Sequence, residues 1–249
     1  MRPPRRVRSG RSTPRHGLAR VISKLGIASR TQAARWIAEG RVSVDGRIER
    51  DPERPTDASR ERIELDGEIL AARRFQYLAM NKPRGYVTTT SDERGRDTVY
   101  ALLAEAGLPW LAPVGRLDKA SEGLLLFSND SMWAARITSP DTHVRKTYHV
   151  QVDCLPDAAL LARMEQGVDD AGERLAVMSV RELRRGDKHA WLEIVLDEGR
   201  NRQIRRILAL LGVGVLRLVR VAIGDVALGA LAKGAWRFLE PAEIEALRR

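Results

Sequence analysis

The stretch GRLDKASEGLLLFSND, residues 115–130, lies near the middle of the 249-residue chain and decides how its larger part folds. Arg116 and Asp118 are two positions apart, so an extended backbone puts both side chains on one side and Leu117 on the other, toward a core. A neighbouring guanidinium favours the ionised carboxylate. An ionised carboxylate at a sheet edge can act as a nucleophile or a general base. From the spacing alone, an ordinary Arg–Asp surface pair is the simpler interpretation.

Short strand-like runs surround this stretch, with few helical segments between them. The strands expected are residues 77–80, 86–89, 124–127, 147–152, 177–180, 190–196 and 215–221. The strongest helix is expected over residues 201–211, with an apolar stripe on one face and Asn201 as its N-cap. This order is not a regular alternation of strand and helix. It predicts the α+β class, with a mixed, largely antiparallel sheet and helices packed on it.

The segment before the sheet reads as a separate small module. Residues 18–25 carry apolar side chains at helical spacing, and Ser29 with Gln32 forms a capping-box pattern before a second helix that Gly40 ends. The pairs Asp45-Gly46 and Asp66-Gly67 follow alternating apolar residues and predict tight hairpin turns. We expect two helices followed by short strands over residues 17–63, and a linker over residues 64–75.

The positive charge is concentrated near the N-terminus. Forty-three Lys and Arg residues against 33 Asp and Glu give a net charge of +10, and residues 1–16 hold six arginines and no acid. We expect this segment to be a disordered basic arm that neutralises phosphates, with a solubilising tail as the alternative. The rest of the chain is much closer to neutral. Any RNA contact in residues 76–249 therefore requires local clusters of basic residues.

Several classes of protein are excluded by composition. A single cysteine, Cys154, excludes an intrachain disulfide framework and a cysteine-based zinc site, and the four histidines show no HExxH spacing. The longest apolar run, residues 207–216, is too short to span a bilayer, and the arginine-rich start is not a secretory signal. No glycine-rich nucleotide motif is present. We expect a soluble cytoplasmic protein with an anionic partner, no membrane association, no metal and no cofactor.

The stretch LARVISKLGIASRTQAARWIAEGRVSVDGRIERDP, residues 18–52, resembles the S4 RNA-binding domain. The resemblance implies a basic helical face, around Arg30, Arg35 and Arg41, that binds structured RNA through its backbone and shape. On its own, the resemblance to the S4 domain does not indicate any catalytic activity. The alternative is that these arginines are simply solvated.

The stretch at residues 115–130 resembles the catalytic signature of pseudouridine synthases, in the ribosomal RNA branch that carries an N-terminal S4 domain. Three further stretches resemble the same branch in the same order: YLAMNKPRGYVTTTSDERGRDTVYALL at 77–103, RITSPDTHVRKTYHVQVD at 136–153, and LDEGRNRQIRRILALLGVGVLRLVRVAIGDVALGALAKGAW at 196–236. Together they cover almost the whole folded chain. The resemblance implies an S4 domain followed by a catalytic domain over residues 76–249.

The resemblance also implies roles for individual residues. Asp118 aligns with the essential aspartate of a reaction that detaches uracil from C1′ of its ribose, turns it and rejoins C5 to C1′. Arg116 would help hold the extruded nucleotide, and Tyr148 would stack on its base. Ile204 would line the base, and Arg205 would pair with Asp118 and keep it charged. Whether Asp118 attacks the sugar, attacks the base or removes a sugar proton stays open.

The remaining candidates are contacts to RNA. These are Lys82, Arg84, Arg200, Arg202 and Arg206, of which the last three cluster at a helix N-terminus where an anion is favoured. The expected substrate is a uridine in ribosomal RNA, free or in a pre-ribosomal particle. Large-subunit (23S) RNA is favoured over small-subunit (16S) RNA. The expected state is a monomer. Two other functions remain as alternatives: a non-catalytic S4-type RNA-binding or ribosome-assembly protein, and a metal-dependent nuclease.

Overall fold

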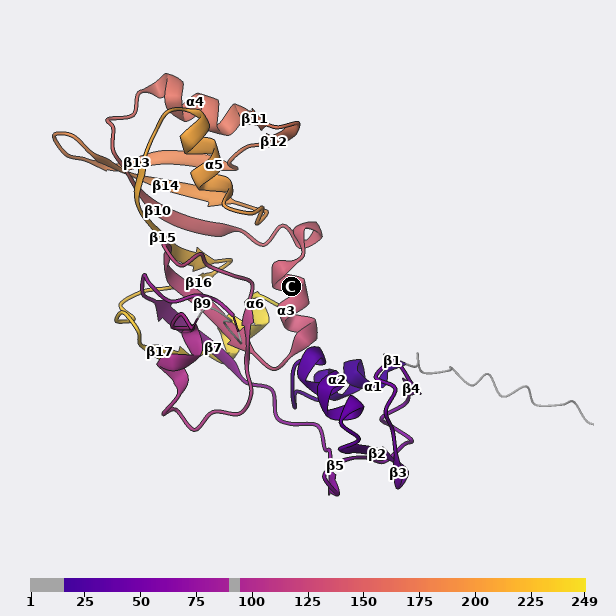
Figure 1. Ribbon diagram of the computed structural model, residues 1–249. Helices are drawn as coiled ribbons and strands as arrows, with labels where there is room; N and C mark the ends of the chain where they lie inside the picture. Colours follow the sequence, from indigo (N-terminus) through magenta and orange to yellow (C-terminus); the bar gives the residue numbers. More distant parts are fainter. Residues whose placement is uncertain (1–15, 90–94) are drawn as a thin grey trace, which may run out of the picture. The chain divides into compact units, whose positions relative to one another are not determined.

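The computed structural model describes residues 16–89 and 95–249 (Figure 1). The chain divides between Arg74 and Phe75 into two compact units, each with its own core. The basic arm expected over residues 1–16 lies outside the described residues except for His16. None of the helices in the described ranges is long and apolar enough to cross a membrane.

The first unit packs two helices against a small sheet. Helix α1 spans Leu18–Lys24, helix α2 spans Arg30–Ala38, and the four-stranded sheet has the order β3-β2-β5-β6. Its strands are β2 (Val42–Val44), β3 (Arg47–Ile48), β5 (Ile63–Leu65) and β6 (Glu68–Ile69), and a separate pair joins β1 (His16–Gly17) to β4 (Pro55–Thr56). Leu18, Ile22 and Ile37 are fully buried between the helices and the sheet.

Local signals set the turns of this unit. The Ser29 hydroxyl accepts a hydrogen bond from the Gln32 backbone N–H at 3.0 Å, as an N-cap should. Both residues of Asp45-Gly46 and of Asp66-Gly67 have positive φ, which the tight hairpin turn requires. The hairpin at Asp66-Gly67 joins β5 to β6, so regular structure extends into the stretch expected to be a linker.

The second unit is built on a nine-stranded sheet. Its main order is β13-β14-β10-β15-β9-β7-β17, with β16 paired to β15 and β8 to β9. Only β15 and β9 are parallel; the other pairs in this sheet are antiparallel, which confirms the expected α+β class with a largely antiparallel sheet. The strands are β7 (Tyr77–Lys82), β8 (Ala112–Val114), β9 (Glu122–Ser128), β10 (Lys146–Val152), β13 (Ser179–Arg185), β14 (Ala190–Leu196), β15 (Val215–Ile223), β16 (Val226–Ala227) and β17 (Trp236–Phe238).

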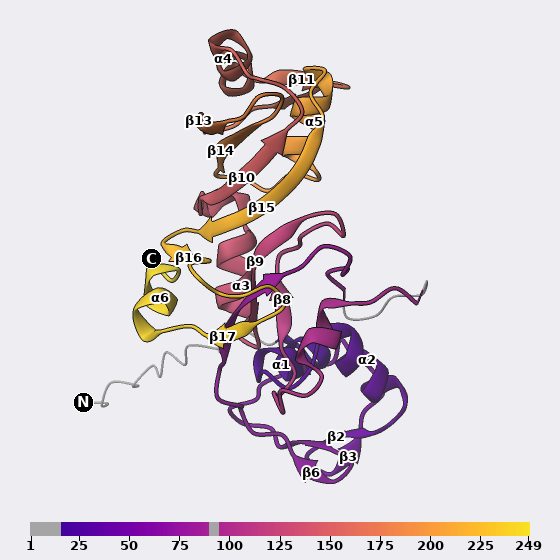
Figure 2. The same cartoon turned by 90° about the vertical axis from the view of Figure 1, so that its left-hand side faces the viewer.

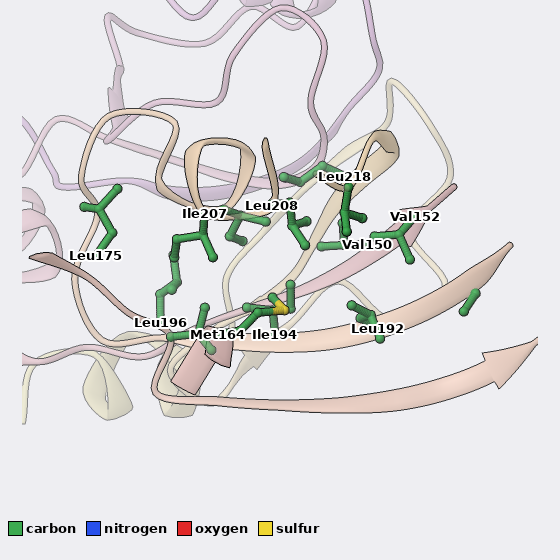
Figure 3. Packing of buried hydrophobic residues seen from close by; sticks show 14 residues of the cluster. Val150, Val152, Met164, Leu175, Leu192, Ile194, Leu196, Ile207, Leu208 and Leu218 are labelled. Carbon is green, nitrogen blue, oxygen red and sulfur yellow. The ribbon is translucent and has the colours of Figure 1, made fainter. Parts of the chain in front are cut away.

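Helices cover this sheet in two groups. Helices α4 (Ala158–Gln166) and α5 (Gln203–Leu210) lie over the half formed by β13, β14 and β10 (Figure 1). Figure 3 shows Ile207 and Leu208 pointing from α5 toward the strand residues Val150, Ile194 and Leu196. The other half packs against α3 (Ser131–Thr138) and α6 (Pro241–Ala246). The remaining elements are the short 3₁₀ helices Val99–Leu103 and Pro140–Thr142 and the hairpin of β11 (Val168–Asp170) and β12 (Glu173–Leu175).

The parallel junction of β9 and β15 joins the two halves of the sheet (Figure 2). Gly123 lies opposite Arg220 there, with φ of +100°. A Cβ atom at Gly123 would lie 2.2 Å from the Arg220 carbonyl oxygen, so no other residue fits this backbone approach. The glycine therefore fixes the distance between the strand that follows the Asp118 loop and the strand that carries Arg220.

Three local expectations were wrong. Residues 86–89 form no strand; within them only Val87 makes an isolated bridge, to Thr98. The strand expected over residues 177–180 is β13, which starts at Ser179 and continues to Arg185. Helix α5 begins at Gln203, and its N-cap is Arg202 in a left-handed conformation, not Asn201. The extent of β13 follows from its pairing with β14, which the local pattern does not contain.

Candidate active site

Asp118 lies in the loop that joins β8 to β9. Leu117 is 6% exposed and packs into the core, so it fixes the loop while Asp118 on its other side is half-buried. The Thr88 hydroxyl donates to the Leu117 carbonyl at 2.8 Å, and the Ser121 N–H donates to the Asp118 carbonyl at 3.0 Å. Hydrogen bonds from Thr88 and Ser121 thus hold the loop that carries the Asp118 carboxyl group.

The loop borders a cavity of about 420 Å³ within the second unit. Beside the loop, the cavity is lined by β10, by β15 and by the start of α5, so it lies where the two halves of the sheet meet. It brings together seven of the residues expected from the sequence: Arg116, Asp118, Tyr148, Arg200, Arg202, Ile204 and Arg205. Ile204 is 3% exposed, and Tyr148 is half-buried on β10.

Two arginines at the start of α5 approach the Asp118 loop differently. The Arg202 Nη1 atom lies 3.5 Å from Asp118 Oδ2, whereas Arg205 donates from Nη2 to the Ala120 carbonyl at 3.2 Å. Burial lowers the pKa of Arg205, and the charges of Arg202 and Arg84 lower it further while that of Asp118 raises it. The expected Arg205–Asp118 ion pair is therefore not the contact observed. Arg202 reaches the carboxylate because its left-handed N-cap conformation places it outside the helix.

The other arginines of this cluster have acidic partners. Arg200 pairs with Glu198 at 2.8 Å and with Glu173 at 3.1 Å, and Arg206 pairs with Asp170 and with Glu173. Arg206 does not line the cavity, so its expected role as a phosphate contact is not supported by its position. Its side chain instead attaches α5 to the β11–β12 hairpin.

Lys82 also differs from the expectation. It is fully buried, and its ammonium donates to the carbonyl oxygens of Asp118 at 3.1 Å, Ser121 at 2.8 Å and Pro83 at 3.1 Å. Burial lowers its pKa to about 8. A side chain in this position cannot contact RNA; it ties the Asp118 loop to the end of β7. Arg84 is exposed and lies outside the cavity lining.

The basic residues expected to bind RNA in the first unit are all exposed. They are Arg30, Arg35 and Arg41. Arg35 pairs with Glu39 at 2.8 Å, while Arg41 pairs with Asp66 at 2.6 Å and lies 5.7 Å from the ring centre of Trp36. These pairs lie at the surface and cost little to exchange for a phosphate.

Two cavity residues were missed from the sequence. Lys146 and Arg220 are 8% and 5% exposed, and both line the cavity. The sequence carries a signal for Arg220, which lies between Val219 and Val221 in an expected strand. Lys146 lies just before an expected strand, between Arg145 and Thr147, and its neighbours give no sign that it is buried.

Comparisons with known proteins decide the family. Residues 76–210 match the family model described as RNA pseudouridylate synthase, and residues 17–59 match that of the S4 domain. The chain belongs to the RNA pseudouridylate synthase family. The expected enzyme class and the order of an S4 domain before a synthase domain are thereby confirmed.

Relatives and a solved structure agree with this membership. An uncharacterized RNA pseudouridine synthase of Aquifex aeolicus is 36% identical over 230 residues, covering 92% of both chains. Ribosomal large subunit pseudouridine synthase B of Escherichia coli strain K12 is 35% identical over 238 residues, covering 93% of this chain and 81% of the relative. A crystal structure of a pseudouridylate synthase matches with a TM-score of 0.64 and 30% identity, over 93% of this chain and 99% of that one.

Proposed function

We propose that this enzyme converts a uridine of large-subunit (23S) ribosomal RNA to pseudouridine, and that Asp118 is the reacting carboxylate. The observation that carries the proposal is the position of Asp118 at the edge of a cavity that it shares with Tyr148 and Ile204. The Arg202 guanidinium lies 3.5 Å from this carboxylate and places a positive charge beside it.

The cavity suits a single nucleotide. Its volume of about 420 Å³ lies within the range of roughly 300–1,000 Å³ found for small-molecule sites. The target uridine must leave its helix or loop to reach Asp118, which costs unstacking energy. Stacking on the Tyr148 ring returns roughly 1–3 kcal/mol of that cost. Ile204 offers an apolar surface to the base, and exposed Arg116 is available to the flanking backbone.

The reaction requires no net addition or removal of atoms. The bond from C1′ to N1 breaks, uracil turns in the cavity, and a bond from C1′ to C5 forms while C5 loses its proton and N1 gains one. Asp118 starts this sequence by attacking the sugar or the base or by removing a sugar proton. All three routes need an ionised carboxylate held beside the nucleotide.

The rest of the chain supplies RNA affinity. We assign RNA binding to residues 17–63, where Arg30, Arg35 and Arg41 are exposed, and catalysis to residues 76–249. The basic segment 1–16 adds contacts to phosphate. Ribosomal RNA in the cytoplasm, free or in a pre-ribosomal particle, is the substrate. Preference for large-subunit RNA is supported by the 35% identity to large subunit synthase B of Escherichia coli.

Tritium release tests this function. Ribosomal RNA labelled with tritium at C5 of uridine loses the label when C5 bonds to C1′, so the enzyme should release it from 23S fragments and much less from 16S fragments. Mapping pseudouridines in RNA from a deletion strain should then show one or a few 23S positions that remain uridine. Absence of release from every fragment would support the alternative of a non-catalytic RNA-binding protein.

A further inference from the structure

Two basic side chains lie inside the cavity in addition to the arginines near Asp118. Lys146 is the first residue of β10, and Arg220 lies on β15 directly opposite Tyr148. Both side chains are more than nine-tenths buried, and both line the cavity. Two positive charges therefore face the space beside the tyrosine that is proposed to stack on the base.

Neither side chain forms an ion pair with an acid in the described ranges. The Lys146 ammonium makes no hydrogen bond or ion pair with any residue in the described ranges. Arg220 donates from Nε to the Leu124 carbonyl at 2.7 Å, but its Nη2 atom is buried and has no partner there. Burial and the charge of Arg220 lower the pKa of Lys146, while Asp197 raises it. Burying a cation that lacks hydrogen-bond or ion-pair partners costs stability, unless a bound ligand supplies those partners.

Another buried charge in the same sheet does have partners of opposite charge. Glu122, close by on β9, is 1% exposed and is paired with Arg217 at 3.1 Å and with Lys233 at 2.7 Å. Lys146 and Arg220 have no such acid. Unpaired buried charges of this kind indicate a group that binds there during the reaction.

We propose that Lys146 and Arg220 bind the carbonyl oxygens of the target uracil and stabilise the negative charge that the ring acquires when it leaves the ribose. The inference rests on the proposed function, because it assigns the cavity to uridine. Apolar side chains of the same lining favour a flat base over a hydrated phosphate: Ile137, Leu196, Leu218 and Ile223.

The electron balance requires such a group. When C1′–N1 breaks, its electron pair stays with uracil, and conjugation spreads the charge from N1 to O2 and O4. The pair returns when C5 bonds to C1′, after which the C5 proton leaves to water and N1 takes a proton. Removal of a sugar proton by Asp118 expels the same anion, and attack on C6 puts charge on O4. Fixed cations aimed at such charge stabilise it, and the burial of Lys146 and Arg220 limits the screening of their charges by water.

The variant Lys146→Met tests the assignment, because methionine keeps the length of the side chain and removes its charge. We expect kcat for tritium release to fall about 100-fold or more, with KM for the RNA fragment within about threefold and Tm unchanged or raised. The control is Lys188→Met, an exposed lysine in the turn between β13 and β14, which should change none of the three. A wild type that released no tritium would overturn the proposed function, whereas an active Lys146→Met would overturn only this inference.

Two other outcomes also overturn it. A lowered Tm together with the lost activity would make Lys146 a structural residue. A raised KM with unchanged kcat would make it a contact to phosphate in the bound state. The substrate offers a second test: fluorine at C5 of uridine withdraws electrons and stabilises the uracil anion. We expect the ratio of wild-type to Lys146→Met rates, measured as single-turnover loss of the target nucleotide, to be smaller for 5-fluorouridine RNA than for uridine RNA; an equal ratio would contradict the assignment.

Discussion

The Arg202 guanidinium lies 3.5 Å from the Asp118 carboxylate, so an ion pair joins the N-cap of α5 to the loop that carries the candidate reacting group. The Arg202 side chain is 52% exposed and that of Asp118 is 31% exposed, so water and salt screen the pair. Arg205 holds the neighbouring Ala120 carbonyl instead. Arg202 therefore acts on the charge of Asp118, and Arg205 acts on the backbone of the same loop.

The first prediction concerns the positive charge of Arg202 beside Asp118. Arg202→Gln should lower kcat by about fivefold, the effect of a partly exposed ion pair. Raising the salt concentration should narrow the difference from wild type, because the wild-type pair is screened. The measurement is tritium release at several salt concentrations, with Arg185→Gln, which pairs with Glu182, as the control. A difference that grew with salt would contradict this role.

The second prediction concerns the loop backbone. Arg205→Ala should lose most of the activity, about 100-fold, because the loop loses a donor and the cavity loses a half-buried cation. RNA affinity, measured by filter binding, should stay within about twofold of wild type, since exposed residues elsewhere supply it. An Arg205→Ala enzyme with near-normal kcat would remove Arg205 from the site.

Lys82 should give stability a dependence on pH. Its folded pKa of about 8 lies below the ordinary value of 10.5, so above pH 8 the folded state binds fewer protons than the unfolded state. The cost of burying this charge is present below pH 8 and disappears as the pH rises to 10.5. Relative to Lys82→Met, the wild type should therefore gain free energy of unfolding between pH 8 and 10.5. Urea denaturation at several pH values measures this, and a flat difference would show that Lys82 is not buried as an ammonium.

Deleting residues 1–63 should weaken RNA binding and flatten its dependence on salt, because phosphate contacts are lost. The second unit has its own cores, so the cavity around Asp118 should stay folded, as circular dichroism can check. Affinity is measured by filter binding at 50 and 200 mM salt, two concentrations chosen to span roughly the range over which such contacts weaken most. Unchanged affinity would show that another surface anchors the RNA.

Much of the fold could be predicted from local signals. Asp45-Gly46 and Asp66-Gly67 specify their turns through residues that tolerate positive φ, and Ser29 caps its helix with its own side chain. The alternation along β10 and β14 likewise identifies strands without any knowledge of their partners. Here a few adjacent residues determine the conformation, so the sequence pattern was sufficient.

The electrostatic partners could not be predicted, because they join segments far apart in the chain. Arg202 and Asp118 are brought together by the sheet, and nothing near Arg206 in the sequence indicates that it pairs with Asp170 and Glu173. Lys82 was expected to contact RNA, since lysines are rarely buried; three backbone carbonyls make its burial possible. Residue types predicted where the site lies, and tertiary packing determined which charges meet in it.

Asp118→Asn keeps the shape of the side chain and removes its charge, so tritium release by this variant tests the role of the carboxylate. We expect no measurable release from 23S fragments that wild type converts, with RNA affinity and Tm unchanged. The control is Asp187→Asn, an exposed aspartate in the turn between β13 and β14, which should match wild type. Release by Asp118→Asn at a rate close to that of wild type would show that the Asp118 carboxylate does not carry the reaction.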